Sequence, residues 1–306
     1  MNDVSIIGGI TADIEGNPYN QLIQGDSNPG KISMSYGGVG RNITENLARM
    51  GTSVSFISVA GDDFAGRGAV RELQDLGVNV ENVRLLQEEN TAVYMSILNL
   101  MGDMELALCN MDVLERISND FIDAAYDNIK TSKVIGIDTN LTEETLEYTT
   151  RKLKDIPLFL DPVSVTKAER AKKMISRFHT IKPNRMEAEI LSGMTIMSSE
   201  ELEKAAQWFI GQGVKRVFIT LGAGGVYYQD ENESGLLKPN PVEIISATGA
   251  GDAFSAAMIH SYLKDYDIKK TAEAGMAAAA IAMQSKSAVN SKMSGDRLQQ
   301  TLGIKG

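Results

Sequence analysis

Cysteine, histidine and tryptophan are scarce in this chain of 306 residues, which has one cysteine, two histidines and one tryptophan. Cys109 has no partner for an intrachain disulfide, and His179 and His260 are too few for a zinc or histidine-rich metal site. Positive charge is also scarce, with 30 Lys and Arg against 40 Asp and Glu, a net charge of −10. Such a chain would repel nucleic acid and anionic membranes, although a local pocket for one anionic cofactor remains open.

Long hydrophobic runs are missing as well. The longest apolar run lies around Ala277–Met283 and is far too short to cross a membrane. The first residues, Met1–Asp3, precede only a short apolar stretch without a basic region, so no signal peptide is expected. With 43% hydrophobic and 23% charged residues, the composition is that of a folded globular protein, for which we expect a cytoplasmic setting.

The chain alternates buried strands with helices, as expected for a parallel sheet covered on both faces. One helix is expected over 168–178, and an antiparallel strand over Val242–Ile245. Two insertions, about 14–36 and 90–112, have the alternation and glycine–proline punctuation of exposed antiparallel strands. The pattern predicts one α/β domain over 1–306, with a small β lid formed by the two insertions.

Several nucleotide-binding fingerprints are approached but fail. Three G-x-G patterns lack the third glycine of the dinucleotide motif, which is replaced by Ile43, Tyr227 or Phe254, so a hydride-transfer enzyme is not expected. The segment Gly25–Lys31 fits the P-loop spacing, but Ile32 has no hydroxyl for Mg²⁺ and a strand follows instead of a helix. We interpret it as a lid loop.

The segment Ser246–Phe254 carries a clearer signal for catalysis. Small residues lead directly into a helix, whose unpaired N–H groups and dipole create a site for an anion. Asp252 stands at the start of this helix, where it could take the proton of an attacking hydroxyl. A helix that is merely capped after a glycine turn explains the same pattern, and the sequence leaves both interpretations open.

Other polar positions follow predicted strands. The diglycine Gly37-Gly38 allows close approach of a ligand and Asn42 offers both a donor and an acceptor, although an ordinary turn with a helix cap has the same residues. Asp13 follows the first strand, at the edge where open α/β sheets bind ligands, or is a solvated loop aspartate.

The segment Lys182–Glu189 and the turn Thr220–Gly225 each allow two interpretations. Asn184 and Glu187 have the spacing of a capping box, which needs no ligand, or they organise Mg²⁺ and its waters. Thr220–Gly225 is a nucleotide-facing loop or a tight turn.

Together these segments resemble the ribokinase-like (PfkB) family of carbohydrate and nucleoside kinases, and the resemblance spans essentially the whole chain. The motifs occur in the family's order: Gly37–Asn42 with Asn46 and Gly51, Gly61–Gly66, Lys182–Glu189, Thr220–Gly222 and Thr248–Asp252. The resemblance implies a three-layer α/β/α sandwich with a mostly parallel sheet and a β lid. It also implies transfer of the ATP γ-phosphate to a sugar hydroxyl with Mg²⁺.

By matched position, the resemblance implies a role for each motif residue. Asp252 is the implied general base, and Gly249, Ala250 and Gly251 form the anion hole. The implied sugar site contains Asp13, Gly37, Gly38 and Asn42. Asn184 and Glu187 would organise Mg²⁺ through water, while Thr220, Gly222 and Gly225 would lie along ATP. For recognition of a base we assign Ser27, Asn28 and Lys31 of the lid.

Within the family, the sequence is most similar to the pseudouridine kinases, through Asp26–Ile32, Gly38–Asn42, Asp161–Ser164 and His179–Arg185. A kinase for ribose, adenosine or uridine, or a nucleoside-binding protein without activity, remains an alternative. Ser246 stands six residues before Asp252, where potassium-activated members have aspartate, so activation by a monovalent cation is doubtful. The unpaired edge at Lys31–Tyr36 predicts a homodimer formed through the lid.

Overall fold

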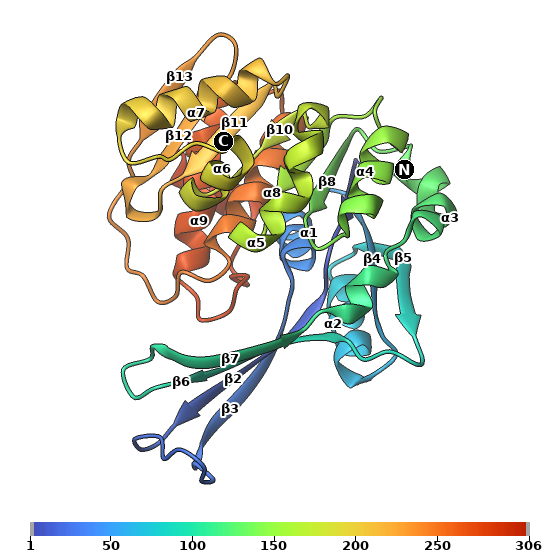
Figure 1. The fold of residues 1–306 in the computed structure, drawn as a ribbon, viewed down its shortest axis with the longest axis vertical. Helices are drawn as coiled ribbons and strands as arrows, with labels where there is room; N and C mark the ends of the chain where they lie inside the picture. The colour runs from blue at the N-terminus through green and yellow to red at the C-terminus, as the bar shows by residue number, and fades with distance from the viewer. Residues whose placement is uncertain (1–2, 304–306) are drawn as a thin grey trace.

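The chain forms a large sheet flanked by helices and a small sheet that extends away from it (Figure 1). The computed structural model describes residues 3–303. Within these residues the large sheet has nine strands, in the order β13-β12-β11-β10-β9-β8-β1-β4-β5. They are β1 (Val4–Ile7), β4 (Val54–Gly61), β5 (Asn79–Leu86), β8 (Val134–Asp138), β9 (Leu158–Asp161), β10 (Thr180–Ile181), β11 (Arg216–Thr220), β12 (Val226–Gln229) and β13 (Ser234–Leu237).

Seven neighbouring strands of this sheet pair in parallel, in the spatial order β5-β4-β1-β8-β9-β10-β11. At the β11 edge, β12 and β13 are added by antiparallel pairing. Ten α-helices and three short 3-10 helices connect the strands of residues 3–303. The α-helices are α1 (Val39–Arg49), α2 (Phe64–Asp75), α3 (Asn119–Ile129), α4 (Glu143–Lys152), α5 (Val165–Ala168), α6 (Arg185–Ser192), α7 (Ser199–Gly211), α8 (Ala250–Leu263), α9 (Ile268–Met283) and α10 (Gly295–Thr301). The 3-10 helices are η1 (Asp112–Arg116), η2 (Glu169–Arg177) and η3 (Gly222–Gly224).

Two hydrophobic clusters cover the two faces of the large sheet. Neighbouring residues of β1 point to opposite clusters, Ile6 to one and Ile7 to the other, because side chains alternate along a strand. Helices α3, α4, α6 and α7 contribute to the cluster of Ile7, and α1, α2, α8 and α9 to that of Ile6. Full burial of each such aliphatic side chain contributes about 1.5–3 kcal/mol. The structure thus confirms the predicted three-layer α/β sandwich.

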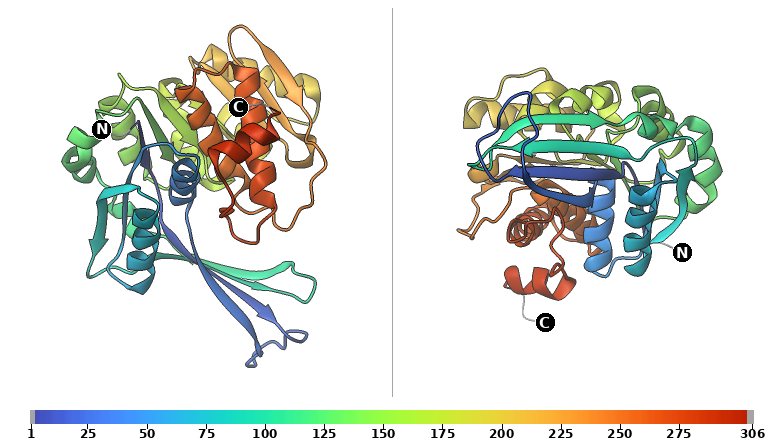
Figure 2. Two further views of the ribbon diagram at one scale, coloured as in Figure 1. Left: turned by 180° about the vertical axis from the view of Figure 1, so that it is seen from behind. Right: turned by 90° about the horizontal axis from the view of Figure 1, so that it is seen from below.

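The small sheet has the strand order β3-β2-β6-β7, with β2 (Thr11–Pro18), β3 (Gly30–Gly37), β6 (Ala92–Leu98) and β7 (Met104–Asn110). Seen from behind, it projects from the body of the molecule (Figure 2). The strands come from the two predicted insertions, about 14–36 and 90–112, although β2 already begins at Thr11 and β3 ends at Gly37.

Strand pairing gives the small sheet one polar and one apolar face. Asp13 pairs with Ser35 and Tyr94, and Tyr94 pairs with Cys109, so these four side chains share a face. The opposite face is mostly apolar, with Ile14, Ile32, Met34, Met95, Ile97, Leu106 and Leu108. Ile32 and Leu108 are 76% and 67% exposed, so this face has no cover within the described part of the chain.

The structure differs from the sequence-based expectations in three local elements. The helix expected over 168–178 is largely the 3-10 helix η2, with a kink at Met174. No strand forms at Val242–Ile245, where the chain has no regular secondary structure and is mostly exposed, and the last strand is instead β13. The edge strand β5 was not predicted, because its half-buried residues lack strict alternation.

The P-loop-like segment Gly25–Lys31 connects two strands. It lies between β2 and β3, and Gly30 already belongs to β3. Since no helix follows, no helix N-terminus is present to hold a phosphate there. The structure therefore agrees with a loop of the small sheet.

Candidate active site

Polar residues gather where neighbouring parallel strands end. Asp138 and Asp161 close β8 and β9, Lys182 follows β10, and Thr220 closes β11. Open α/β sheets bind ligands in the crevice beyond these carboxyl ends. The small sheet leaves the body at the same edge, because β2 follows β1 directly.

The helix α8 begins at this edge with a sharp turn. Gly249, the residue before it, has φ of 79°, and a Cβ there would lie 1.8 Å from the carbonyl oxygen of Ala288. Only glycine fits both constraints. Within residues 3–303 no hydrogen-bond acceptor is recorded for the backbone N–H groups of Gly251 and Asp252. These free donors, at the positive end of a helix of 14 residues, form a site suited to an anion.

Asp252 is held beside this turn by a residue from the other end of the sequence. The Nδ2 atom of Asn42 donates to Asp252 Oδ2 at 2.8 Å. Buried Arg41 donates to Asn42 Oδ1 at 3.2 Å and pairs with Glu45 at 2.7 Å. Arg41 thereby fixes the orientation of the amide, and the amide fixes the carboxylate.

The carboxyl group of Asp252 has a strongly raised pKa. Burial raises its pKa from 3.8 to about 7, and the negative charges of Asp161 and Asp138 act in the same direction. The hydrogen bond from Asn42 and the charge of Lys182 oppose the rise. A carboxylate with a pKa near neutrality is matched to accepting a proton from a hydroxyl.

A buried ion pair lies below the turn. Lys182 Nζ is 3.2 Å from Asp161 Oδ2, and both side chains are almost fully buried. Asp161 also accepts a hydrogen bond from Ser255 of α8 at 2.7 Å, which ties the helix to β9. A Cβ on Gly251 would lie 3.3 Å from Lys182 Nζ, so the ammonium is directly behind the turn. Burial acts to lower the pKa of Lys182, but nearby Asp161, Glu187 and Asp252 together raise it.

Asp13 lies on the polar face of the small sheet, where that sheet meets the body. Thr11 Oγ1 donates to its carboxylate at 2.8 Å, and burial raises its pKa despite this bond and the charge of Arg41. A Cβ on Gly37 would lie 2.0 Å from Asp13 Oδ2, so only glycine leaves room for the carboxylate. Gly38 packs against the backbone of Gly9, where a Cβ would lie 2.4 Å from the carbonyl oxygen.

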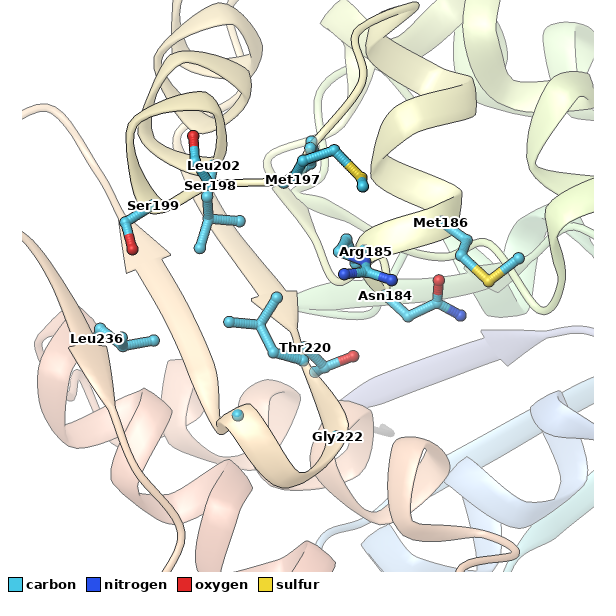
Figure 3. Close-up of a pocket in the computed structure, with 13 residues that line it drawn as sticks. Asn184, Arg185, Met186, Met197, Ser198, Ser199, Leu202, Thr220, Gly222 and Leu236 are labelled. Atoms are coloured by element: carbon cyan, nitrogen blue, oxygen red, sulfur yellow. The ribbon is translucent and has the colours of Figure 1, made fainter.

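Asn184 and Glu187 form the capping box that their spacing allows. Glu187 Oε2 accepts the N–H of Asn184 at 2.8 Å, and Asn184 Oδ1 accepts the N–H of Glu187 at 2.9 Å. Burial raises the pKa of Glu187, against the charge of Lys182. Asn184 bridges to Thr220 of the neighbouring strand, and the two side chains line one cavity (Figure 3).

Within residues 3–303 no group of three or more His, Cys, Asp or Glu side chains is arranged to hold a metal ion. Mg²⁺ commonly keeps several waters and binds through one or two protein groups together with substrate phosphates. Glu187, whose Oε1 has no recorded hydrogen bond within residues 3–303, fits such an incomplete site.

Two cavities flank the turn between β11 and β12. The cavity of Figure 3 has about 600 Å³ and lies between the start of α6, the start of α7 and this turn. The other has about 560 Å³ and is lined by Ala250 and Gly251, by apolar residues of α8 and α9 such as Phe254 and Ala277, and by the segment from Leu237 to Val242. Its volume and apolar walls suit a flat heterocycle, and Ala250 and Gly251 place it next to the turn before α8. Thr220, Gly222 and Gly225 also line it.

The structure therefore brings together most residues that the sequence singled out. Asn42 contacts Asp252, and Asp13 lies beside Gly37 and within electrostatic reach of Arg41, which holds Asn42. Asn184, Thr220 and Gly222 lie together after the neighbouring strands. Ser246 accepts the N–H of Thr248 at 3.2 Å, so its hydroxyl holds the turn before α8.

The three lid residues assigned to the base lie elsewhere. Ser27, Asn28 and Lys31 are exposed in or beside the loop between β2 and β3, at the tip of the small sheet farthest from the body (Figure 1). Asn28 bonds the backbone of Ile23 with both its Oδ1, at 2.7 Å, and its Nδ2, at 3.0 Å. In this conformation Asn28 therefore shapes the loop, and its role in recognition stays a prediction.

Two carboxylates of the site were not assigned a role from the sequence. Buried Asp138 accepts the N–H groups of Gly9 and Gly40, at 3.0 and 2.8 Å. Burial raises its pKa against these bonds. Asp161 pairs with Lys182. The sequence did contain a signal for both residues, because each is an aspartate that ends a buried strand. Such positions lie at the edge where parallel sheets bind ligands.

Fold and site together define an α/β protein with a cavity of about 560 Å³, a helix turn with free N–H donors beside it, and a carboxylate of raised pKa at that turn. Comparison with known proteins gives the family: residues 1–294 match the model of the pfkB family carbohydrate kinases. The chain belongs to this family, whose members are phosphotransferases with an alcohol group as acceptor.

Individual relatives are similar over most of the chain. The pseudouridine kinase of Escherichia coli K12 is 38% identical over 256 residues, which is 83% of this chain and 82% of that protein. The uncharacterized sugar kinase YeiI of the same organism is 35% identical over 95% of this chain and 81% of its own length. A solved carbohydrate kinase from Agrobacterium tumefaciens superimposes with a TM-score of 0.87 at 27% identity, covering 99% of this chain and 98% of that one.

Within residues 3–303 no helix is both long and apolar enough to span a bilayer. A cytoplasmic setting stays a prediction.

Proposed function

We propose that this chain transfers the γ-phosphoryl group of ATP to the ribose 5′-hydroxyl of pseudouridine. Membership of the pfkB family supports phosphoryl transfer to an alcohol. The 38% identity to a pseudouridine kinase supports the acceptor. The observation that carries the proposal is the carboxylate of Asp252, fixed by Asn42 beside the anion-binding turn and with a pKa of about 7.

In this proposal Asp252 Oδ takes the proton as the acceptor hydroxyl attacks phosphorus. The N–H groups around Gly249–Gly251 and the dipole of α8 stabilise the charge that develops on the transferred phosphoryl group. Asp13 and Asn42 hold the sugar hydroxyls, with Gly37 leaving room for the Asp13 carboxylate and Gly38 packing closely on the backbone of Gly9.

ATP is proposed to place its base in the cavity lined by α8, α9 and the segment from Leu237 to Val242, with its phosphates along Thr220, Gly222 and Gly225 toward the turn. Mg²⁺, when bound, neutralises phosphate charge. Asn184 and Glu187 are proposed to orient its waters.

A kinase for another sugar or nucleoside is the second candidate. The observation that favours it is the 35% identity to a sugar kinase over nearly the whole chain, which is only slightly lower than the identity to the pseudouridine kinase. Both candidates use Asp252 in the same way and differ in the acceptor.

The test measures ADP release with ATP and Mg²⁺ on pseudouridine, uridine, ribose, adenosine and fructose 6-phosphate. Asp252→Asn runs beside Asp296→Asn, which changes an exposed aspartate in the first turn of α10. We expect turnover of pseudouridine, a loss of at least ~100-fold in Asp252→Asn and full activity in the control. Turnover restricted to another acceptor would support the kinase activity but refute pseudouridine as the substrate. Nucleoside binding without any turnover would identify a non-catalytic binding protein.

A homodimer through the apolar face of the small sheet is part of the proposal. Contiguous exposed side chains such as Ile32, Met34 and Leu108 favour association with a complementary surface, and a two-fold pair of sheets offers one. Light scattering should give twice the monomer mass, and Leu108→Glu should give a monomer. The control Leu236→Glu changes an exposed leucine on the edge strand β13 and should stay dimeric. A native monomer at working concentration would refute the dimer.

A further inference from the structure

Beyond β8 and β9, a chain of polar contacts leads from the backbone of Gly9 and Gly40 to a lysine that the proposed chemistry does not use. Lys167 Nζ donates to Asn140 Oδ1, and Asn140 Nδ2 donates to Asp138 Oδ2 at 2.9 Å. The same Asp138 oxygen accepts the N–H groups of Gly9 and Gly40. Lys167 is therefore fixed relative to the glycines that border the proposed sugar site.

The ammonium group of Lys167 can donate more hydrogen bonds than are recorded for it within residues 3–303. An ammonium has three N–H groups, and within residues 3–303 the one recorded partner of Lys167 Nζ is Asn140. The side chain is half-buried, and burial together with the charge of Arg170 lowers its pKa, although Asp138 and Cys109 oppose this. A half-buried cation without a direct carboxylate partner is costly, which suggests that a ligand completes its contacts.

Lys167 lies near the small sheet. It lies within electrostatic reach of Cys109 on β7, and Cys109 shares the polar face of the small sheet with Asp13. Asp138 lies within electrostatic reach of both Lys167 and Asp252. The small sheet thus lies near a fixed ammonium, and Asp138 links that ammonium electrostatically to the proposed general base, Asp252.

We propose that Lys167, oriented by Asn140, determines specificity by donating a hydrogen bond to a carbonyl oxygen of the base that the acceptor's ribose carries. The inference rests on the proposed function and names the group that separates a nucleoside from a free sugar. An ammonium has no acceptor atom, so its ligand must supply an oxygen lone pair. A pyrimidine base supplies carbonyl oxygens, whereas free ribose has nothing in that position.

A phosphate group on the acceptor is less suited to this site. Phosphate recognition commonly uses several cations or a bidentate arginine. Arg170 lies within electrostatic reach of Lys167, but its Nη1 already donates to the carbonyl oxygens of Thr139, Asn140 and Leu141. One ammonium held by a neutral amide matches a neutral carbonyl better than a dianion.

Calorimetry on the full chain, with pseudouridine and with ribose as separate probes, tests the proposal. Lys167→Met should weaken pseudouridine binding ~10-fold or more, because a hydrogen bond from a charged donor is lost, and should leave ribose binding within about twofold of the native value. The matched control is Lys172→Met, which removes an exposed lysine of η2 that pairs with Glu169. Asn140→Ala, which keeps the ammonium but not its orientation, should weaken pseudouridine binding by a smaller factor.

The possible results separate this inference from the proposed function. If native protein binds and phosphorylates pseudouridine but Lys167→Met binds it equally well, the inference fails and the function stands. An equal loss for pseudouridine and ribose would indicate a structural role and would also overturn the inference. If native protein acts on a sugar or a sugar phosphate and binds no nucleoside, the proposed acceptor fails, and the role of Lys167 fails with it.

Discussion

The substitution Asp252→Asn should make the protein inactive and, above neutral pH, more stable. The folded-state pKa of Asp252 is about 7, well above its ordinary value of 3.8. The folded protein therefore binds this proton more tightly than the unfolded chain does. The contribution of Asp252 to stability is most favourable below pH ~4 and is lost as the pH rises to about 7.

The magnitude follows from the difference between the two pKa values. Each pH unit between them costs about 1.4 kcal/mol, so ionisation of Asp252 in the native protein opposes folding by up to about 4 kcal/mol above pH ~7. Asparagine avoids this cost and still accepts the hydrogen bond of Asn42 through its own Oδ1. The stability advantage of the variant should grow by about 2 kcal/mol between pH ~5.5 and ~7 and then stay constant.

Urea unfolding of the native protein, Asp252→Asn and the control Asp296→Asn at about five pH values measures this advantage. A chain of this length should also melt roughly 2 °C higher for each kcal/mol gained. An advantage that does not change between pH ~5.5 and ~7 would show that Asp252 does not have a raised pKa, and the assignment of the base would lose its electrostatic support.

Two further substitutions test other parts of the site. Asp161→Asn should move the acid limb of the pH–rate profile to lower pH by about one unit, because it removes a negative charge that raises the pKa of Asp252, whereas Lys182→Met should move it to higher pH. Shifts of the same sign would contradict this electrostatic account. Gly37→Ala should raise KM for the acceptor ~10-fold or more with little change in KM for ATP, because its Cβ would lie 2.0 Å from Asp13 Oδ2. Steady-state kinetics with each substrate varied would give both constants, and an unchanged acceptor KM would mean that Asp13 does not hold the acceptor.

Local patterns in the sequence predicted most elements of the fold. Helix α6 begins after the capping residue Asn184 and ends before Gly193, and both signals are plain in the sequence. Buried strands such as β8 stand out as short apolar runs between polar segments. The 3-10 helix η2 could not be distinguished from an α-helix, because the two differ in hydrogen-bond register and not in composition.

The sequence by itself determined the residue types of the candidate site, because the glycine turns, the aspartate after Gly251 and the capping pair are local patterns. Only the tertiary structure brought Asn42 to Asp252, 210 positions apart, and placed Lys182 behind the turn. The tertiary structure also placed the lid residues Ser27, Asn28 and Lys31 at an exposed tip. It placed Lys167 beside Asn140 and near Cys109 of the small sheet, which no local pattern indicates. Such contacts depend on strand order and on which side chains lose water, and both are properties of the packed chain rather than of any segment.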